Sequence, residues 1–137
     1  MTIRNAAQSR RNKARGRRAE RDVADLLAQH FQFADRKRQK GSQDQGDVGG
    51  VPDLTIEVKD LASFNLAKMV DEAMVEKENA GTRWCVAVQR RPKRNIREAY
   101  AVQPLEMFIE MYARLQELEE RERQRQQDGQ PGAVPEA

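Results

Sequence analysis

Two acidic residues and a lysine lie near the middle of the chain, in an order suited to phosphodiester hydrolysis. Glu57 and Lys59 are separated by one residue, and Asp47 precedes them across a segment with two glycines and a proline. A carboxylate can bind a divalent cation, which lowers the pKa of a bound water and neutralises charge on a phosphate. An ammonium group beside it can position or deprotonate that water. These residue types indicate a metal-dependent phosphodiesterase.

The segment from Leu54 to Lys59 has the alternation of a half-buried β-strand. Leu54, Ile56 and Val58 are apolar, and the residues that follow each of them are polar. This is the period of a strand with one face toward the core and one toward solvent. We therefore expect Glu57 and Lys59 to project from the same face of one strand.

Two aspartates precede this strand, and chain geometry distinguishes them. Asp53 lies four residues before Glu57, so within one strand their Cα atoms would be about 13 Å apart. Two short carboxylates cannot easily share a cation over that distance. If residues 49–53 form a turn, Asp47 falls opposite Thr55 and diagonal to Glu57 on the same face. This register favours Asp47 as a ligand over Asp53. The alternative is a surface hairpin with solvated charges.

The order Asp, turn, Glu-x-Lys resembles the motif of the PD-(D/E)xK nuclease superfamily. The predicted order of elements is most similar to the archaeal-type Holliday junction resolvases, over roughly residues 14–118. The resemblance implies an α/β, restriction-endonuclease-like fold, with a mixed central β-sheet flanked by helices. It also implies one or two Mg²⁺ (or Mn²⁺) ions held by Asp47, Glu57 and the carbonyl of Val58, with Lys59 acting on the attacking water.

Two further residues gain a role through this resemblance. Glu20 follows Gly16 on the predicted first helix, where the family carries a glutamate of the metal site. Ser42 stands in the loop before Asp47, where some members use a serine. Without the resemblance, Glu20 would be a solvated helix residue and Ser42 a turn former. The predicted catalytic set is Glu20, Ser42, Asp47, Glu57 and Lys59, with Glu20 also a metal ligand.

Positive charge is concentrated in the N-terminal arm, before the proposed site and after the predicted strand 84–89. Such groups bind phosphates without reading sequence, although a basic arm can also serve only to keep a protein soluble. Aromatic residues form 5% of the chain, which disfavours a base-stacking platform for single strands. The predicted partner is DNA, and the resemblance implies four-way junctions cut by a homodimer. The predicted contacts are Arg15, Arg17, Arg18, Arg21, Arg36, Arg38, Lys40, Arg90 and Arg91.

Apolar periodicity divides the chain into three parts. Residues 1–12 are predicted to form a disordered basic arm, residues 13–118 the nuclease domain, and residues 119–137 a charged helix extension with a disordered tail. The predicted order in the domain is helix, strand, hairpin, helix, strand, strand, helix. The strands are expected at Phe31–Arg38, Leu54–Lys59, Trp84–Gln89 and Ala99–Val102. The helices are expected at 14–30, from a cap at either Ser63 or Asn65 to Gly81, and from Pro104.

Composition excludes several classes of protein. Cys85 is the sole cysteine and His30 the sole histidine, so an intrachain disulfide cannot form and histidine-based zinc sites are disfavoured. We expect a reducing, cytoplasmic setting and no membrane association, since no apolar run approaches the length of a span. Three functions remain: a junction-resolving endonuclease, a superfamily nuclease with another DNA substrate, and a non-catalytic nucleic-acid-binding module.

Overall fold

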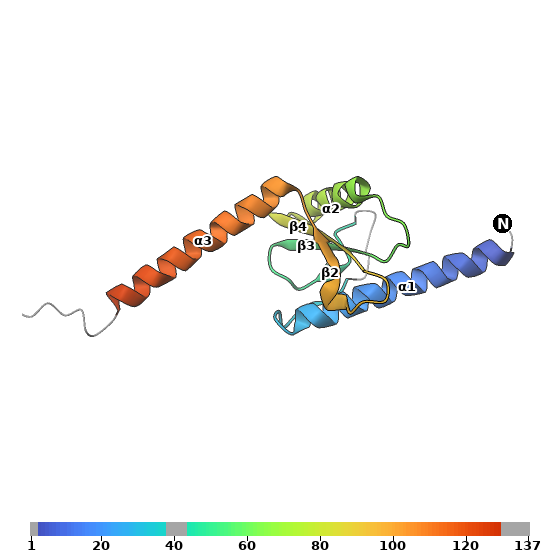
Figure 1. Cartoon of the computed structure of the whole chain (residues 1–137), viewed down its shortest axis with the longest axis horizontal. Coiled ribbons are helices and arrows are strands. Elements are labelled where there is room, and N and C mark those ends of the chain that lie inside the picture. The colour runs from blue at the N-terminus through green and yellow to red at the C-terminus, as the bar shows by residue number, and fades with distance from the viewer. Residues whose placement is uncertain (1–2, 38–43, 130–137) are drawn as a thin grey trace, which may run out of the picture. The chain divides into compact units, whose positions relative to one another are not determined.

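The computed structural model describes residues 3–37 and 44–129, which divide into two units between Gln103 and Pro104. The first unit contains a five-stranded mixed sheet, and the described part of the second is one helix, orange to red in Figure 1. An α/β fold with a mixed sheet is therefore confirmed. The boundary differs from the predicted domain end at residue 118. Pro104 has no backbone N–H to continue the preceding strand, so the chain changes from sheet to helix there.

The sheet has its strands in chain order, from β1 at one edge to β5 at the other. β3 and β4 pair in parallel, and the other neighbouring strands pair antiparallel. The parallel pair lies at the centre, where Glu57 stands beside Ala87. The strands are β1 (Asp35–Arg36), β2 (Val48–Gly49), β3 (Leu54–Lys59), β4 (Trp84–Gln89) and β5 (Tyr100–Val102).

The helix α2 (Leu66–Ala80) makes the crossover that a parallel strand pair requires. Its start is capped by Asn65, whose side chain accepts a hydrogen bond from the Lys68 N–H at 3.1 Å. Its end lies at Gly81, which has a φ of 71° and donates its N–H to carbonyls of the last turn. Of the two predicted cap residues, Ser63 and Asn65, the helix uses Asn65, and it ends at Gly81 as predicted.

The helix α1 (Ile3–Ala28) is longer than predicted. It includes most of the arm expected to be disordered, because residues 4–13 are mainly alanine, arginine, lysine and glutamine and lack glycine and proline. The strand expected from Phe31 to Arg38 is reduced to β1. The Phe31 N–H bonds to the Leu27 carbonyl at 2.8 Å and continues the helix end as a turn.

Gly50 fixes the turn between β2 and β3. Its φ is 80°, and a Cβ there would lie 1.8 Å from the carbonyl oxygen of Phe33. Only a residue without a side chain allows the chain to pass this close to the turn that follows α1. The contact holds the β2–β3 connection against the end of α1.

The core lies on both faces of β3. On one face, Ile56 and Val58 pack with residues of α1 such as Ala19 and Val23. On the other face lies α2, and the Cys85 Sγ of β4 is 3.5 Å from Met74 Sδ. Figure 1 shows α1 and α2 on opposite sides of the sheet. The prediction of a half-buried strand is therefore wrong, because α2 covers its polar face: Thr55 and Glu57 are 2% and 5% exposed.

The second unit is the helix α3 (Leu105–Asp128), which begins after Pro104 as predicted and includes the charged extension. Its charged half carries exposed ion pairs between residues three or four apart. These pairs are Arg114–Glu117, Arg121–Glu117, Arg123–Glu120 and Arg125–Glu122. Among the described helices, none combines the length and the apolar character needed to cross a membrane.

Candidate metal centre

Glu57 is the central residue of a buried group of carboxylates beside β3. Its Oε1 forms an ion pair with the Lys59 Nζ at 3.1 Å. Its Oε2 is buried and has no hydrogen-bond partner among the described residues. A buried carboxylate oxygen without a partner is energetically costly. Glu57 therefore offers an oxygen that a cation or a proton would stabilise.

Lys59 is held between two carboxylates. Its Nζ lies 3.1 Å from Glu57 Oε1 and 3.0 Å from Glu72 Oε2 on α2. Burial alone would lower the pKa of Lys59, but the hydrogen bonds and charges of Glu72 and Glu57 outweigh it and raise that pKa above its ordinary value. Lys59 is thus a fixed ammonium group, suited to orienting a water or a phosphate and unsuited to removing a proton.

Asp47 lies next to Glu57 across the β2–β3 pair. Val48 pairs with Ile56, so Asp47 falls opposite Glu57 rather than opposite Thr55. The predicted register is wrong by two residues, which leaves the face unchanged. The Asp47 N–H donates to the Ile56 carbonyl at 2.8 Å, and the Val58 N–H donates to Asp47 Oδ2 at 2.7 Å.

The surroundings of Asp47 disfavour its charge. Burial raises the pKa of Asp47 to about 8, and the charges of Glu57 and Glu20 add to this effect, against the hydrogen bond from Val58. Gly46 allows this close approach: its φ is 97°, and a Cβ there would lie 3.0 Å from the Ile56 carbonyl oxygen. The chain thus holds an acid where neighbouring acids oppose its ionisation.

A second group of acids lies around Glu57, on the side of α2. Asp44, Glu57 and Glu76 each offer a carboxylate oxygen, and these oxygens lie within 4.8 Å of one another. Glu76 is 5% exposed, and its Oε2 has no partner in the described parts of the chain. Burial raises the pKa of Glu76 to about 10, and Glu57 and Asp44 add to the effect. These three residues are close enough to bind a metal ion.

The pairing of β3 with α2 explains these contacts. The helix returns antiparallel to the strand, because it connects two parallel strands. Glu57 and Lys59 share one face of β3, and Glu72 and Glu76, four residues apart, share one face of α2. Because α2 runs in the opposite direction to β3, Glu72 lies beside Lys59 and Glu76 lies beside Glu57.

Sequence reasoning missed Asp44, Glu72 and Glu76. One signal was present for Glu76: with Met69 and Ala73 it forms the buried stripe of α2 at helical spacing. A glutamate in a core position of a helix seldom lacks a specific partner. Asp44 had no such signal. It is held by the chain around it, since its Oδ1 accepts the Gly46 N–H at 2.9 Å and its carbonyl accepts the Asn79 side chain at 2.9 Å.

Asp53 lies in a turn and is bonded elsewhere. Its φ is 58°, and its carboxylate accepts the Arg83 N–H at 2.6 Å and the Arg83 Nε at 3.0 Å. It therefore anchors the start of β4. Ser42 lies outside the described residues. The ligand role of the Val58 carbonyl stays a prediction.

Glu20 is paired with Arg36. Its Oε2 accepts hydrogen bonds from Arg36 Nε and Nη2 at 3.0 and 2.9 Å. Its charge still acts on Asp47, whose pKa it helps to raise. Glu20 is thus close enough to the carboxylate group to interact with it, and its role as a ligand stays a prediction.

The predicted DNA-binding arginines fall into two kinds. Arg17 and Arg18 are exposed on α1, whereas others are bonded within the protein. The Arg91 guanidinium lies 5.1 Å from the ring centre of Tyr100. Arg38 and Lys40 lie outside the described residues. The ion-paired arginines are Arg15 with Asp60, Arg21 with Asp35, Arg36 with Glu20 and Arg90 with Asp22.

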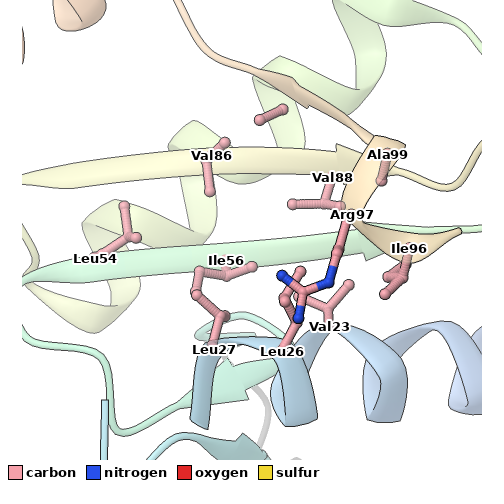
Figure 2. Close-up of a pocket in the computed structure, with 11 residues that line it drawn as sticks. Val23, Leu26, Leu27, Leu54, Ile56, Val86, Val88, Ile96, Arg97 and Ala99 are labelled. Carbon is pink, nitrogen blue, oxygen red and sulfur yellow. The ribbon is translucent and has the colours of Figure 1, made fainter. Parts of the chain in front are cut away.

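Two hollows adjoin this part of the fold. A polar groove of about 280 Å³ lies between α1 and the end of β3, lined by residues that include Arg15, Gly16 and Lys59. An open hollow of about 260 Å³ lies between α1 and the sheet. Figure 2 shows the apolar side chains that line it, such as Leu27 and Val88. Arg97 is its one charged residue. The polar groove, beside Lys59, is the one suited to a charged ligand.

Comparison of the chain with protein-family models, curated proteins and solved structures gave no match. The chemistry of the site therefore carries the argument. Buried acids with partnerless oxygens, next to a fixed ammonium group, fit a divalent cation with oxygen ligands.

Proposed function

We propose that the protein is a metal-dependent DNA endonuclease that cuts four-way junctions as a homodimer. The observation that carries the proposal is the pairing of Asp47, which is half-buried just before β2, with the buried Glu57 of β3, with Lys59 beside them. This is the Asp, Glu-x-Lys arrangement of the PD-(D/E)xK nucleases that the sequence resembles. The restriction-endonuclease-like form of the mixed sheet is part of the same proposal.

Repulsion among the carboxylates supports a cation at this position. Glu57 and Glu20 oppose ionisation of Asp47, so the metal-free group retains protons that a cation would displace. Asp47 and Glu57 would hold Mg²⁺ or Mn²⁺, with Glu20 and the Val58 carbonyl as further ligands. When bound, the ion would lower the pKa of the attacking water and stabilise the charge of the phosphate in the transition state.

The chain's own groups position the other reactants. Lys59 stays protonated between Glu57 and Glu72 and donates hydrogen bonds. It would orient the attacking water or a non-bridging phosphate oxygen. The Val58 N–H holds Asp47 Oδ2 at 2.7 Å, which limits rotation of that carboxylate. Such preorganisation lowers the cost of reaching the reactive geometry.

The polar groove supports a path for the DNA strand. It contains Lys59 and Arg15 and passes along α1. Contacts from these groups to phosphates would position a duplex without reading its bases. Two symmetric cuts in a junction need two active sites, so the resemblance implies a homodimer.

A cleavage assay tests the function. The full chain is incubated with Mg²⁺ and a four-way junction, a linear duplex or a flap of matched sequence. We expect paired nicks in the junction that need the metal. Cutting of the linear duplex instead would assign a nuclease with another substrate. Binding without metal-dependent cutting of any of the three would refute both enzyme functions.

The matched variants are Asp47→Asn and Asp53→Asn. Each replaces one carboxyl group near the β2–β3 turn with an amide, but Asp53 is engaged with Arg83, away from Glu57. Asp47→Asn should abolish cutting and Asp53→Asn should retain it. The reverse result would show that the ligand set was assigned to the wrong aspartate.

A further inference from the structure

We propose that Asp44, Glu57 and Glu76 form a second divalent-cation subsite, on the α2 side of Glu57 and separate from the position at Asp47. It rests on the proposed function only in sharing Glu57 with that position. The subsite would take a hard cation with oxygen ligands, such as Mg²⁺ or Mn²⁺. One ligand comes from the segment before β2, one from β3 and one from α2.

The spacing of the oxygens fits a single ion. The ligand atoms of the three residues lie within 4.8 Å of one another. Ligands on opposite sides of an ion are separated by twice the metal–oxygen distance, about 4.2 Å for Mg²⁺ and about 4.8 Å for Ca²⁺. Little movement of the side chains is then needed to complete the three contacts.

Buried oxygens without partners provide an independent indication. Glu57 and Glu76 are each 95% buried, and the Oε2 atom of each has no hydrogen-bond partner in the described residues. A surface cluster of acids would leave these atoms to water. Here the protein holds them inside, between β3 and α2, where an ion would satisfy both.

Asp47 has a different set of acidic neighbours from Glu76. Its Oδ2 is bonded to the Val58 N–H, and its close acidic neighbours are Glu57 and Glu20. The acidic neighbours of Glu76 are Glu57 and Asp44. Glu57 is the member common to both groups, so it would bridge two ions.

Lys59 limits where the second ion can lie. Its ammonium group contacts Glu57 Oε1 and Glu72 Oε2. A cation must therefore use the Oε2 side of Glu57, which is the atom without a partner. The acids of β3 and α2 thus bind the ammonium group of Lys59 at one position and would bind the second metal ion at the next.

Calorimetric titration with Mn²⁺, without DNA, tests the subsite in the full-length chain. We expect two ions for each wild-type chain, one for Glu76→Gln and one for Asp47→Asn. Glu57→Gln should weaken both by at least about tenfold, because it is shared. Glu78→Gln is the matched control on α2, since Glu78 is exposed and pairs with Lys77, and it should bind two ions. A thermal melt of each variant confirms folding, and Asp44→Asn provides a second route to the same loss.

The outcomes separate this subsite from the proposed nuclease. Equal binding by wild type and Glu76→Gln, in number and affinity, would overturn the subsite. A single ion kept in Asp47→Asn and lost in Glu76→Gln would support the subsite and overturn Asp47 as a ligand. Two ions in a protein that cuts no DNA would support the subsite and defeat the proposed function.

Discussion

The acids of the sheet unit and those of α3 behave in opposite ways. In α3, Glu117 and Glu122 are exposed and paired with arginines, whose hydrogen bonds lower the pKa of each carboxyl. In the sheet unit, burial and neighbouring acids raise the pKa of Asp47 to about 8 and that of Glu76 to about 10. The surroundings of the carboxyl groups thus favour ionisation on α3 and oppose it beside β3.

The difference identifies where the protein gives up stability. Ion pairs on an exposed helix keep a segment helical and soluble at little cost. Buried acids without cationic partners destabilise the fold unless something binds to them. A binding site is the ordinary reason to retain such a group. Substitutions in the two regions should therefore have unequal effects.

Removing the charge of Glu57 should have the largest consequence for activity. Glu57→Gln should lower metal-dependent DNA cutting by about 100-fold or more, because a ligand to the ion is lost. In α3, Glu120→Gln removes an acid that pairs with Arg123 and should leave the rate unchanged. Single-turnover cleavage of a labelled junction measures both. Equal losses of cleavage rate in the two variants would show that acids of the two regions do not differ in their contribution to activity.

Metal-free stability should fall as pH rises. Glu76 and Asp47 have ordinary pKa values of 4.5 and 3.8 and values of about 10 and 8 in the folded protein. The folded chain then binds more protons than the unfolded chain, so stability declines as pH rises between about pH 4 and pH 10. Urea unfolding in EDTA at pH 6 and pH 9 measures the decline.

Glu76→Gln sharpens the pH test. The glutamine side chain introduced at position 76 cannot ionise, so the stability of this variant should depend less on pH than that of the wild type. Above neutral pH it should be the more stable of the two without metal. A pH dependence equal to that of the wild type would show that Glu76 is not the group responsible.

Asp53 tests whether an acid of the sheet unit can be purely structural. Asp53→Asn keeps a residue that tolerates the left-handed backbone but loses the charged hydrogen bonds to Arg83. We expect a loss of about 1 kcal/mol in the free energy of unfolding and unchanged Mn²⁺ stoichiometry. Denaturation and titration of one preparation measure the two quantities. A loss of a bound ion would place Asp53 in the metal centre.

The smallest effect is expected in α3. Glu117 pairs with Arg114 and Arg121, and all three side chains are exposed. Glu117→Gln should leave the melting temperature and the helical circular-dichroism signal within experimental error, because exposed pairs contribute little. A fall of several degrees would show that these pairs stabilise the fold.

Local signals predicted the elements that depend on local chemistry. The strands near Leu54–Lys59 and Trp84–Gln89 and the cap at Asn65 follow from alternation and capping, which act over a few residues. The burial of the polar face of β3 could not be predicted from local sequence signals, because it depends on where α2 packs. The β2–β3 register was wrong by two residues for a similar reason: Gly46 and Gly50 make long-range backbone contacts that set it.

The candidate site was predictable only in part. Asp47, Glu57 and Lys59 stand together in the sequence, and the structure brings them together. Glu76 reaches Glu57 only through the crossover, which a strand-based motif does not contain, and Asp44 lies before β2, where its carbonyl accepts a hydrogen bond from Asn79 of α2. A motif can thus indicate one side of a binding site while the fold supplies the other.

The return of α2 along β3 restricts how the chain can change in length. One residue inserted between Glu72 and Glu76 would rotate one of them by about 100° away from the strand. Insertions in residues 60–64, before the helix, would leave both on the same helix face. Loop-length changes there should be tolerated in designed variants, whereas the single helical turn from Glu72 to Glu76 acts as a fixed spacer between the two carboxylates.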